Sequence, residues 1–460
     1  MKYIRFIPLL AILLLASGCG VLVQEAFQPN VLTDRPVKIT AAAEIFPEER
    51  VEQLPLTADE VWSKRQQELP SGFSADLLAW LAERDEALLH DLFYLADEEK
   101  QAVSGQDWWF DRVGMTFHCM NDLFTGTAES AENIHVLKEN YGERITLAFT
   151  GDVCLADDWE NMLVYRDMGA DITKNLTGGL LDTLNRADIT LINNEFCYSL
   201  RGKPLPYKLY TFRADPANVS LMQAMGADIV SLANNHCYDF GPEAFADTLT
   251  TLRDAGIPYV GAGENLAEAC TPQYFVVNGM KIAYVASTRA EKFILTPEAS
   301  ETSPGVLRAY DPAVSVEVVK EAEKNADIVI VYPHWGTENS TVLEDAQLEL
   351  AELYVEAGAD LIVGAHPHCL QGMEYIGSCP VIFSLGNFWF NTSAGSTALL
   401  WAELDYHTGF ALRMIPCRMG SAITAQVDGT AAGQAILDHL ARLSPEVNLD
   451  EDGWMTPKNS

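Results

Sequence analysis

Five short apolar runs in this chain end in polar clusters, and that repetition constrains the fold more than any other feature. The runs begin at Ile145, Ile189, Ile229, Ile328 and Leu361. They end in Gly151-Asp152, in Asn193-Asn194-Glu195, in Ala233-Asn234-Asn235-His236, in His334-Trp335-Gly336 and in His366-Pro367-His368. Each run has the length of a strand. Since ligands gather at the carboxyl ends of parallel strands, these side chains are expected to converge on one edge.

The segments between these runs have helical periodicity, so the pattern predicts an α/β body. Helices are expected over 217–225, 243–255, 314–325 and 347–357, and a final one over 430–443. Further strands are expected over 259–261, 275–287, 381–385 and 399–404. The Asn278-Gly279 pair predicts a hairpin inside the run 275–287.

The N-terminus reads as an export signal. Met1 to Arg5 carries positive charge, Phe6 to Ala16 is almost wholly apolar, and small residues precede Cys19. Ala16-Ser17-Gly18-Cys19 resembles a lipobox, in which the cysteine becomes the acylated first residue, although Leu is more usual where Ala16 stands. We therefore expect residues 1–19 to be a signal peptide with a lipobox and the protein to be exported and lipid-anchored, with secretion as the alternative.

The rest of the chain divides by pattern into four regions. We expect a tether over 20–57, a helical N-terminal region over 58–140, the α/β domain over 141–420, and a C-terminal helix and tail over 421–460. The net charge of −35 disfavours nucleic-acid binding. Eight cysteines follow Cys19, and buried free thiols are expected in preference to disulfides.

Four of the nine histidines lie in the polar clusters: His236, His334, His366 and His368. A single histidine of this kind is more often structural, but four at matching positions beside carboxylates favour a metal site. Imidazole, carboxylate and amide oxygen suit Zn²⁺, Mn²⁺ or Fe, and one or two ions are expected. The alternative for His366-Pro367-His368 is a proline-stiffened loop, and for 231–241 a strand-to-helix turn.

Taken together, the clusters carry a family resemblance. Gly151-Asp152, Asn194-Glu195, Ala233-Asn234-Asn235-His236, His334-Trp335-Gly336, Gly364 to His368 and Ser384 to Phe388 resemble the motifs of the CapA (PgsA) proteins of poly-γ-glutamate capsules. That family resembles the calcineurin-like metallophosphatases in fold. The resemblance covers about Ile145 to Phe390 and implies a sandwich of mixed β-sheets flanked by helices, whereas the helical N-terminal addition is expected from the sequence pattern alone.

The resemblance also implies roles for individual residues. The implied metal ligands are Asp152, Glu195, Asn235, His334, His366 and His368. His236 would be the acid that protonates a leaving group, and Asp239 would orient it. Asn387 and Ser384 would line or brace the pocket. Cys154 stands where classical phosphoesterases have a histidine. There are three alternatives: the cysteine supplies a thiolate ligand, the site holds only one metal, or the side chain merely packs. Packing is favoured.

A local basic segment follows Glu195. Between Phe196 and Ala214 there is no acidic residue, while Arg201, Lys203, Lys208 and Arg213 all lie there. Such a loop is suited to a phosphate or a polyglutamate carboxylate, and the alternative is a chance surface cluster.

Three functions fit these observations. The first is metal-dependent, phosphoesterase-like hydrolysis of a cell-surface polymer or its precursor. The second is a non-catalytic capsule component that binds anionic polymer or stabilises membrane synthase subunits. The third is an exported general phosphoesterase.

Overall fold

The computed structural model of the chain describes residues 114–116, 118–119, 122, 131–137, 144–291 and 295–458. The signal peptide, Cys19, the tether and most of the helical region expected over 58–140 lie outside these residues. One described part of that region, Ile134–Val136, is a strand (β1) that pairs with a later strand. Among the described residues, no helix combines the length and apolarity that crossing a membrane requires.

The described strands form two large mixed sheets. The first has seven strands, in the order β1, β10 (Gln273–Val277), β11 (Met280–Thr288), β13 (Ile328–His334), β14 (Leu361–Val363), β16 (Cys379–Ile382) and β15 (Met373–Ile376). The main path of the second runs β21 (Val447–Leu449), β22 (Trp454–Pro457), β19 (Gly409–Gly420), β18 (Gly395–Asp405), β2 (Ile145–Val153), β4 (Ile189–Asn194), β7 (Ile229–Ser231) and β8 (Tyr259–Val260). Strands β17 (Asn387–Trp389), β20 (Ile423–Gln426) and β3 (Leu176–Thr177) join its sides.

Alternating side chains place apolar surface on both faces of each sheet. In β2, Ile145, Leu147 and Phe149 pack toward the first sheet, whereas Ala148 packs toward helices. In β13, Ile330 and Tyr332 join the core between the sheets, and the intervening valines pack on helices. Strands covered on both faces read as continuous apolar runs, which explains the sequence pattern.

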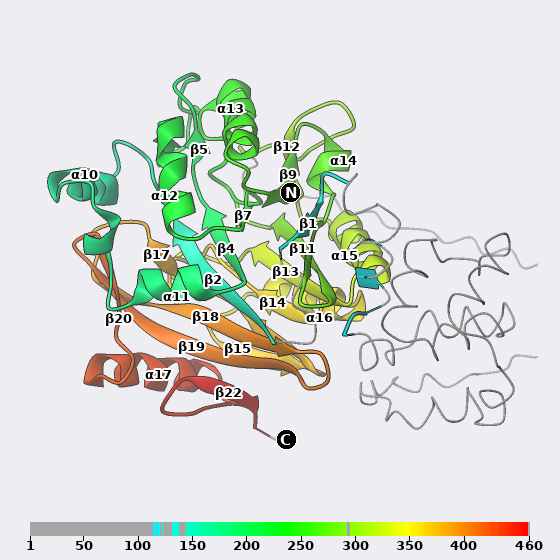
Figure 1. Ribbon diagram of the computed structural model, residues 1–460. Helices are drawn as coiled ribbons and strands as arrows, with labels where there is room; N and C mark the ends of the chain where they lie inside the picture. The colour runs from blue at the N-terminus through cyan, green and yellow to red at the C-terminus, as the bar shows by residue number, and fades with distance from the viewer. Residues whose placement is uncertain are drawn as a thin grey trace, which may run out of the picture. The chain divides into compact units, whose positions relative to one another are not determined.

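Helices cover the outer faces. The second sheet carries α10 (Glu160–Asp167), α11 (Leu180–Arg186), α12 (Val219–Ala224) and α13 (Gly241–Asp254), and the first carries α15 (Ala313–Asn325) and α16 (Asp345–Glu356) (Figure 1). The result is the expected sandwich of mixed sheets flanked by helices. The shorter α14 (Leu266–Ala269) and the small pairs β5 (Cys197–Tyr198) with β6 (Arg213–Ala214) and β9 (Ala262–Gly263) with β12 (Gly305–Val306) lie in connecting segments.

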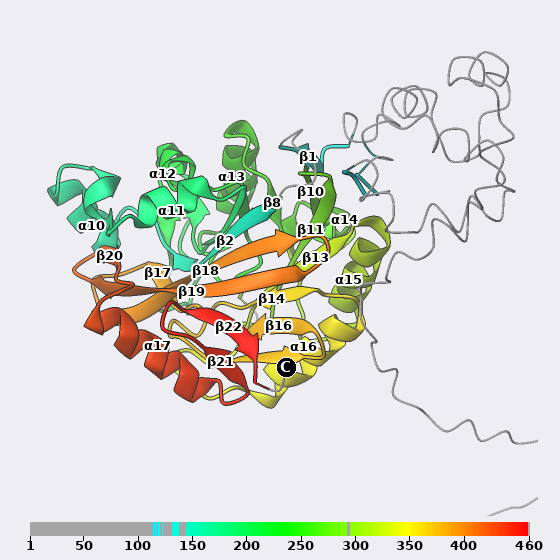
Figure 2. The ribbon, with the colours of Figure 1, turned by 60° about the horizontal axis from the view of Figure 1, so that its bottom comes forward.

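The expected elements are found with small shifts of their bounds. The Asn278-Gly279 turn joins antiparallel β10 and β11. The final helix is α17 (Ala431–Leu443), whose Ile436, Leu437 and Leu440 enter the core between the sheets. Residues 421–460 are more than a helix and a tail, because β20 and β22 both pair with β19, beside the long hairpin of β18 and β19 (Figure 2).

The parallel pairs determine where the polar clusters lie. β2, β4 and β7 are parallel neighbours in one sheet, and β11, β13 and β14 are parallel neighbours in the other. Their carboxyl ends therefore meet at one edge of the sandwich. A close backbone approach supports this edge: Asp152 N donates to Gly386 O at 2.9 Å, and a Cβ on Gly151 would lie 1.8 Å from that oxygen.

Candidate metal centre

The edge where the strands end holds a buried cluster of carboxylates and imidazoles. Two groups of side chains have ligand atoms within 4.8 Å of one another: Glu195 with His334 and His366, and Asp152 with Glu195 and His368. Glu195 belongs to both groups. Asn235 joins them, since its Oδ1 lies 2.8 Å from His334 Nε2. The structure therefore brings together all six side chains named as ligands from the sequence.

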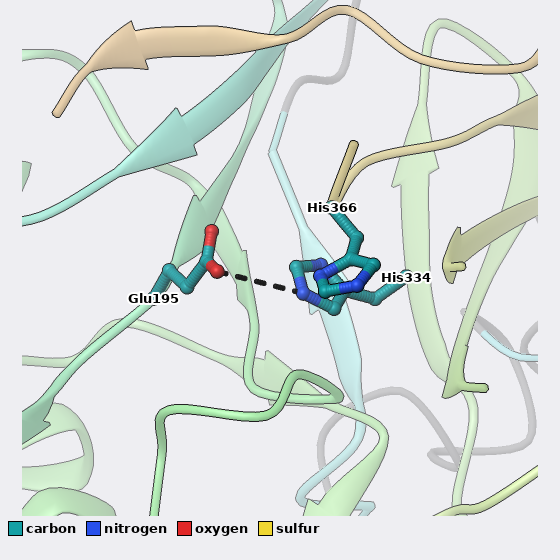
Figure 3. A group of neighbouring side chains, drawn as sticks. All are labelled: Glu195, His334 and His366. Carbon is teal, nitrogen blue, oxygen red and sulfur yellow. Dashed lines mark ion pairs between the residues drawn. The ribbon is translucent and has the colours of Figure 1, made fainter. Parts of the chain in front are cut away.

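Glu195 lies at the middle of this cluster. Its Oε1 is 3.5 Å from His334 Nε2, 4.0 Å from His368 Nε2 and 4.0 Å from His236 Nε2. Figure 3 shows the carboxylate of Glu195 facing the rings of His334 and His366, which lie close together. Those two ring centroids are 4.7 Å apart. Three imidazole nitrogens thus approach one carboxylate oxygen.

Two atoms of the cluster are buried without a hydrogen-bond partner, namely Glu195 Oε1 and His366 Nδ1. Buried polar atoms are normally paired, because an unpaired one costs about 1–3 kcal/mol. Both atoms belong to side chains of the first group. A divalent cation would supply the missing partner for each, so the residues fit a metal ion.

The protonation of two of the histidines also suits a metal. Burial, together with neighbouring histidines, lowers the pKa of His366 to about 3 and holds that of His334 well below its usual value. Both rings are therefore neutral, which is the form that coordinates. Burial opposes charge on Asp152, but the hydrogen bond and charge of His368 outweigh it and its pKa is lowered. Burial and the charge of Asp152 raise the pKa of Glu195.

Backbone strain coincides with two of the histidines. His366 has φ 98° and His368 has φ 56°, on either side of Pro367. Such angles for residues with a Cβ cost on the order of 1–3 kcal/mol and persist where the surroundings impose them. Two oxygens hold the His368 ring in its position, since its Nδ1 lies 3.0 Å from Asp152 Oδ2 and 2.8 Å from Asn387 Oδ1.

His236 and Asp239 form a second, adjoining pair. His236 Nδ1 is 2.7 Å from Asp239 Oδ2, and the opposite nitrogen, Nε2, faces Glu195. The same Asp239 oxygen accepts the Phe212 backbone N–H at 2.7 Å, and the Phe212 ring packs against His236 at 4.5 Å between centroids. Burial lowers the pKa of His236, and the charge of Asp239 offsets this effect only in part.

The four cations of the basic segment have different surroundings. Arg201 pairs with Asp247 on α13, with Nε 3.0 Å from Oδ2. Arg213 lies over the Phe240 ring at 4.3 Å, and Lys203 is exposed. The side chain of Lys208 is buried, and its Nζ lies 2.8 Å from Asp239 Oδ1 and 2.7 Å from Glu291 Oε1. Three of these cations are thus already engaged within the protein.

Of the other named residues, Ser384 braces the edge rather than facing the cluster, since its hydroxyl donates to Cys369 O at 2.8 Å. Cys154 packs among apolar side chains, and burial raises the pKa of its thiol well above the usual value. Cys237 is buried. Across the described part of the chain, the eight cysteines from Cys119 to Cys417 are free thiols.

Sequence reasoning missed the asparagines that position the ligands. Asn193 Nδ2 donates to Asp152 Oδ1 at 2.8 Å and to Glu195 Oε2 at 3.3 Å. Asn234 Nδ2 donates to Asn193 Oδ1 at 3.1 Å, and its own Oδ1 accepts the His236 N–H at 3.0 Å. The role of Asn193 could have been predicted from the sequence, because residues i and i+2 of a strand share a face and Asn193 lies two positions before Glu195.

The sequence matches the family described as "Bacterial capsule synthesis protein PGA_cap" over residues 146–392. It is 36% identical over 298 residues to the capsule biosynthesis protein CapA of Bacillus anthracis, which covers 63% of this chain and 71% of that protein. It is 34% identical over 244 residues to the PGA biosynthesis protein CapA of Bacillus subtilis, covering 52% of this chain and 63% of that protein. The chain thus matches less than two thirds of the B. subtilis relative.

Among solved structures, the NAD nucleotidase of Haemophilus influenzae is similar with a TM-score of 0.37 and 14% sequence identity. The similarity covers 67% of this chain and 64% of that protein. It is a partial likeness.

Proposed function

Because this chain belongs to the bacterial capsule synthesis protein family PGA_cap, we propose that it acts in the biosynthesis, export or anchoring of poly-γ-glutamate through a metal-dependent hydrolytic site. The observation that carries the hydrolytic part is the buried cluster around Glu195, with three imidazoles within 4.0 Å of one carboxylate oxygen. The reaction class is hydrolysis of a phosphoester or a related acyl bond of a cell-surface polymer or its precursor.

Six side chains would hold the metal, one ion or two: Asp152, Glu195, Asn235, His334, His366 and His368. Nitrogen and oxygen donors of this kind suit Mn²⁺, Zn²⁺ or Fe. When bound, such a group lowers the pKa of a coordinated water and stabilises negative charge on the bond under attack. Asn193 orients two of the ligands by donating to both carboxylates.

His236 moves the proton in this proposal. Asp239 accepts from its Nδ1 and leaves Nε2, which faces the cluster, to donate to a leaving-group oxygen. The lowered pKa keeps the ring neutral at rest, so Nε2 must first take up a proton; the charged ring is then a stronger acid than a free imidazolium, and Asp239 stabilises its charge. A proton held at Nε2 therefore lies beside the ligands and not at the protein surface.

Lys208 takes a different role from the one its sequence context suggested. It is buried between Asp239 and Glu291 and also donates to the Asn235 carbonyl. We assign it to positioning: it holds the loop after β5 against the pair Asp239 and His236. Burial opposes its charge, but the two carboxylates raise its pKa, so it stays protonated.

The non-catalytic alternative makes a different prediction for the same cluster. A capsule component that only binds polymer or stabilises synthase subunits would bind metal without turnover. Lipid anchoring through Cys19 and an extracellular location stay predictions of the sequence, since those residues lie outside the described ranges.

The test is metal analysis followed by turnover. We expect the purified full chain to carry a transition metal and to hydrolyse bis(p-nitrophenyl) phosphate. His236→Ala should keep the metal and lose turnover, whereas Arg253→Ala, on the far end of α13, should change neither. Metal binding with no turnover of any ester would favour the non-catalytic role, and absence of metal uptake would refute the hydrolytic site.

A further inference from the structure

A cavity of about 520 Å³ adjoins the metal cluster. Asn235 and His366 lie in its wall, so it is continuous with the proposed ligands. Other parts of the wall are Arg289, Tyr310 and three carboxylates, those of Glu291, Glu338 and Glu344. A space of this size accommodates more of a ligand than the bond being cleaved. The remaining wall residues therefore select which chemical groups of the ligand can bind next to the reacting group.

Arg289 is the one lysine or arginine among the described residues that line the cavity. It follows β11 directly, and its backbone N–H donates to His334 O at 2.9 Å. Thr288, the residue before it, pairs in register with His334. The position of Arg289 is thus tied to the end of the strand that supplies one of the proposed ligands.

The side chain of Arg289 is held in place, yet some of its N–H donors have no partner among the described residues. Its guanidinium lies over the Tyr310 ring at 4.9 Å, and Nη1 is 3.3 Å from Glu344 Oε2. Glu344 has other partners as well, because it caps the N-terminus of α16 and accepts from Thr337 Oγ1. An arginine has five N–H donors in a planar fork, so one contact to Glu344 orients the fork and leaves donors for a ligand.

The cations expected from the sequence to receive the substrate lie elsewhere in the structure. Arg201 is paired with Asp247, Lys208 with Asp239 and Glu291, and Arg213 lies over Phe240. None of these three lies in the cavity wall as described.

We propose that the cavity binds an oxyanion of the substrate, a carboxylate or a phosphate, through the guanidinium of Arg289. This oxyanion is separate from the group that is cleaved, and the inference rests on the proposed function for the identity of the site. The Tyr310 ring supports the guanidinium. Glu338 is exposed in the same wall and suits an N–H donor beside the oxyanion, which an amide-linked glutamyl unit has and inorganic phosphate lacks.

Direct binding tests this inference. The probes are a γ-glutamyl pentapeptide and inorganic phosphate, titrated calorimetrically into the metal-loaded full chain. Arg289→Ala should weaken binding of the oxyanion by about tenfold or more, and Arg289→Lys by less, since the charge stays but the fork is lost. Arg253→Ala is the matched control, because Arg253 also pairs with carboxylates and lies over a tyrosine ring.

The probes separate the two sources of the oxyanion. Weakening of the pentapeptide alone in Arg289→Ala, with Glu338→Gln weakening it further, identifies the glutamyl carboxylate. Weakening of phosphate identifies a phosphate. The inference would be overturned if wild type, Arg289→Ala and Arg253→Ala bind the pentapeptide with one affinity and bind phosphate with one affinity, while metal content and melting temperature are unchanged.

Failure of the proposed function has a different signature. If the wild type shows no metal and no turnover but binds the pentapeptide through Arg289, the oxyanion site stands and the hydrolytic site does not. If turnover and metal are intact while Arg289→Ala binds as the wild type does, only the present inference fails.

Discussion

The two ends of the parallel strands use aspartate and glutamate in opposite ways. Four strands are preceded by an aspartate whose carboxylate accepts a backbone N–H from the neighbouring strand. These pairs are Asp188 with Thr146 N at 2.8 Å, Asp228 with Thr190 N at 2.8 Å, Asp327 with Lys281 N at 2.7 Å and Asp360 with Val329 N at 2.9 Å. At the starting ends, carboxylates complete the hydrogen bonding of the sheet.

At the carboxyl ends the carboxylates face one another and the histidines. Asp152 and Glu195 share the Asn193 amide, and Glu195 Oε1 has no hydrogen-bond partner. β4 has an acid at each end, Asp188 before its start and Glu195 after its end, so the position of an acid at a strand end does not by itself identify a ligand. Asp188 accepts a backbone N–H, whereas one oxygen of Glu195 has no hydrogen-bond partner in the described part of the chain.

Metal removal should have the largest effect and act only at the carboxyl ends. Treating the full chain with a chelator should abolish ester hydrolysis, and adding back Mn²⁺, Zn²⁺ or Fe²⁺ should restore it. The melting temperature should fall as well, because the buried oxygens and imidazoles lose their partner. If turnover survives complete metal removal, verified by elemental analysis, the acids at the carboxyl ends are not catalytic metal ligands and the difference between the two ends is refuted.

His236→Ala should lower turnover by about 10²- to 10⁴-fold, the range for loss of a proton-transfer group. Metal content should not change, because His236 adjoins the ligands without belonging to them. Steady-state kinetics and elemental analysis on one preparation measure both. A variant with wild-type turnover would remove His236 from the mechanism.

Lys208→Met should destabilise the fold by about 3 kcal/mol, since it leaves the buried Asp239 and the half-buried Glu291 without their cation. The exposed Lys320, which pairs with Glu317, provides the control, and Lys320→Met should lie within about 0.5 kcal/mol of wild type. Urea unfolding measures both. Equal stability of the two variants would show that Lys208 is not a brace.

Asp228→Asn should have the smallest effect, confined to the pH dependence of stability. Burial raises the pKa of Asp228 to about 6, so the folded state holds a proton that the unfolded state releases near its usual pKa. This contribution favours the fold at low pH and is lost as pH rises from about 4 to about 6. The variant should be about 1 kcal/mol more stable than wild type at pH 7.5, with metal content unchanged. An unaltered pH profile of unfolding would contradict this assignment.

Local patterns in the sequence predicted the strands and their polar endings, and the family resemblance implied a set of ligands that the structure brings together. The sequence did not predict which residues meet the ligands from a distance. Lys208 reaches Glu291 across 83 positions, and no local pattern distinguishes it from the exposed Lys203. Arg289 follows a strand like the ligands do, but its cavity forms only when the wall residues Tyr310 and Glu344 come together.

The most direct test of the account is the metal content of two variants altered at opposite ends of β4. Glu195→Gln removes a charge at the carboxyl end, and Asp188→Asn removes one at the start. We expect wild type and Asp188→Asn to carry equal amounts of transition metal and Glu195→Gln to bind it at least about 100-fold more weakly. Equal metal content in all three proteins, or none in any of them, would contradict the account.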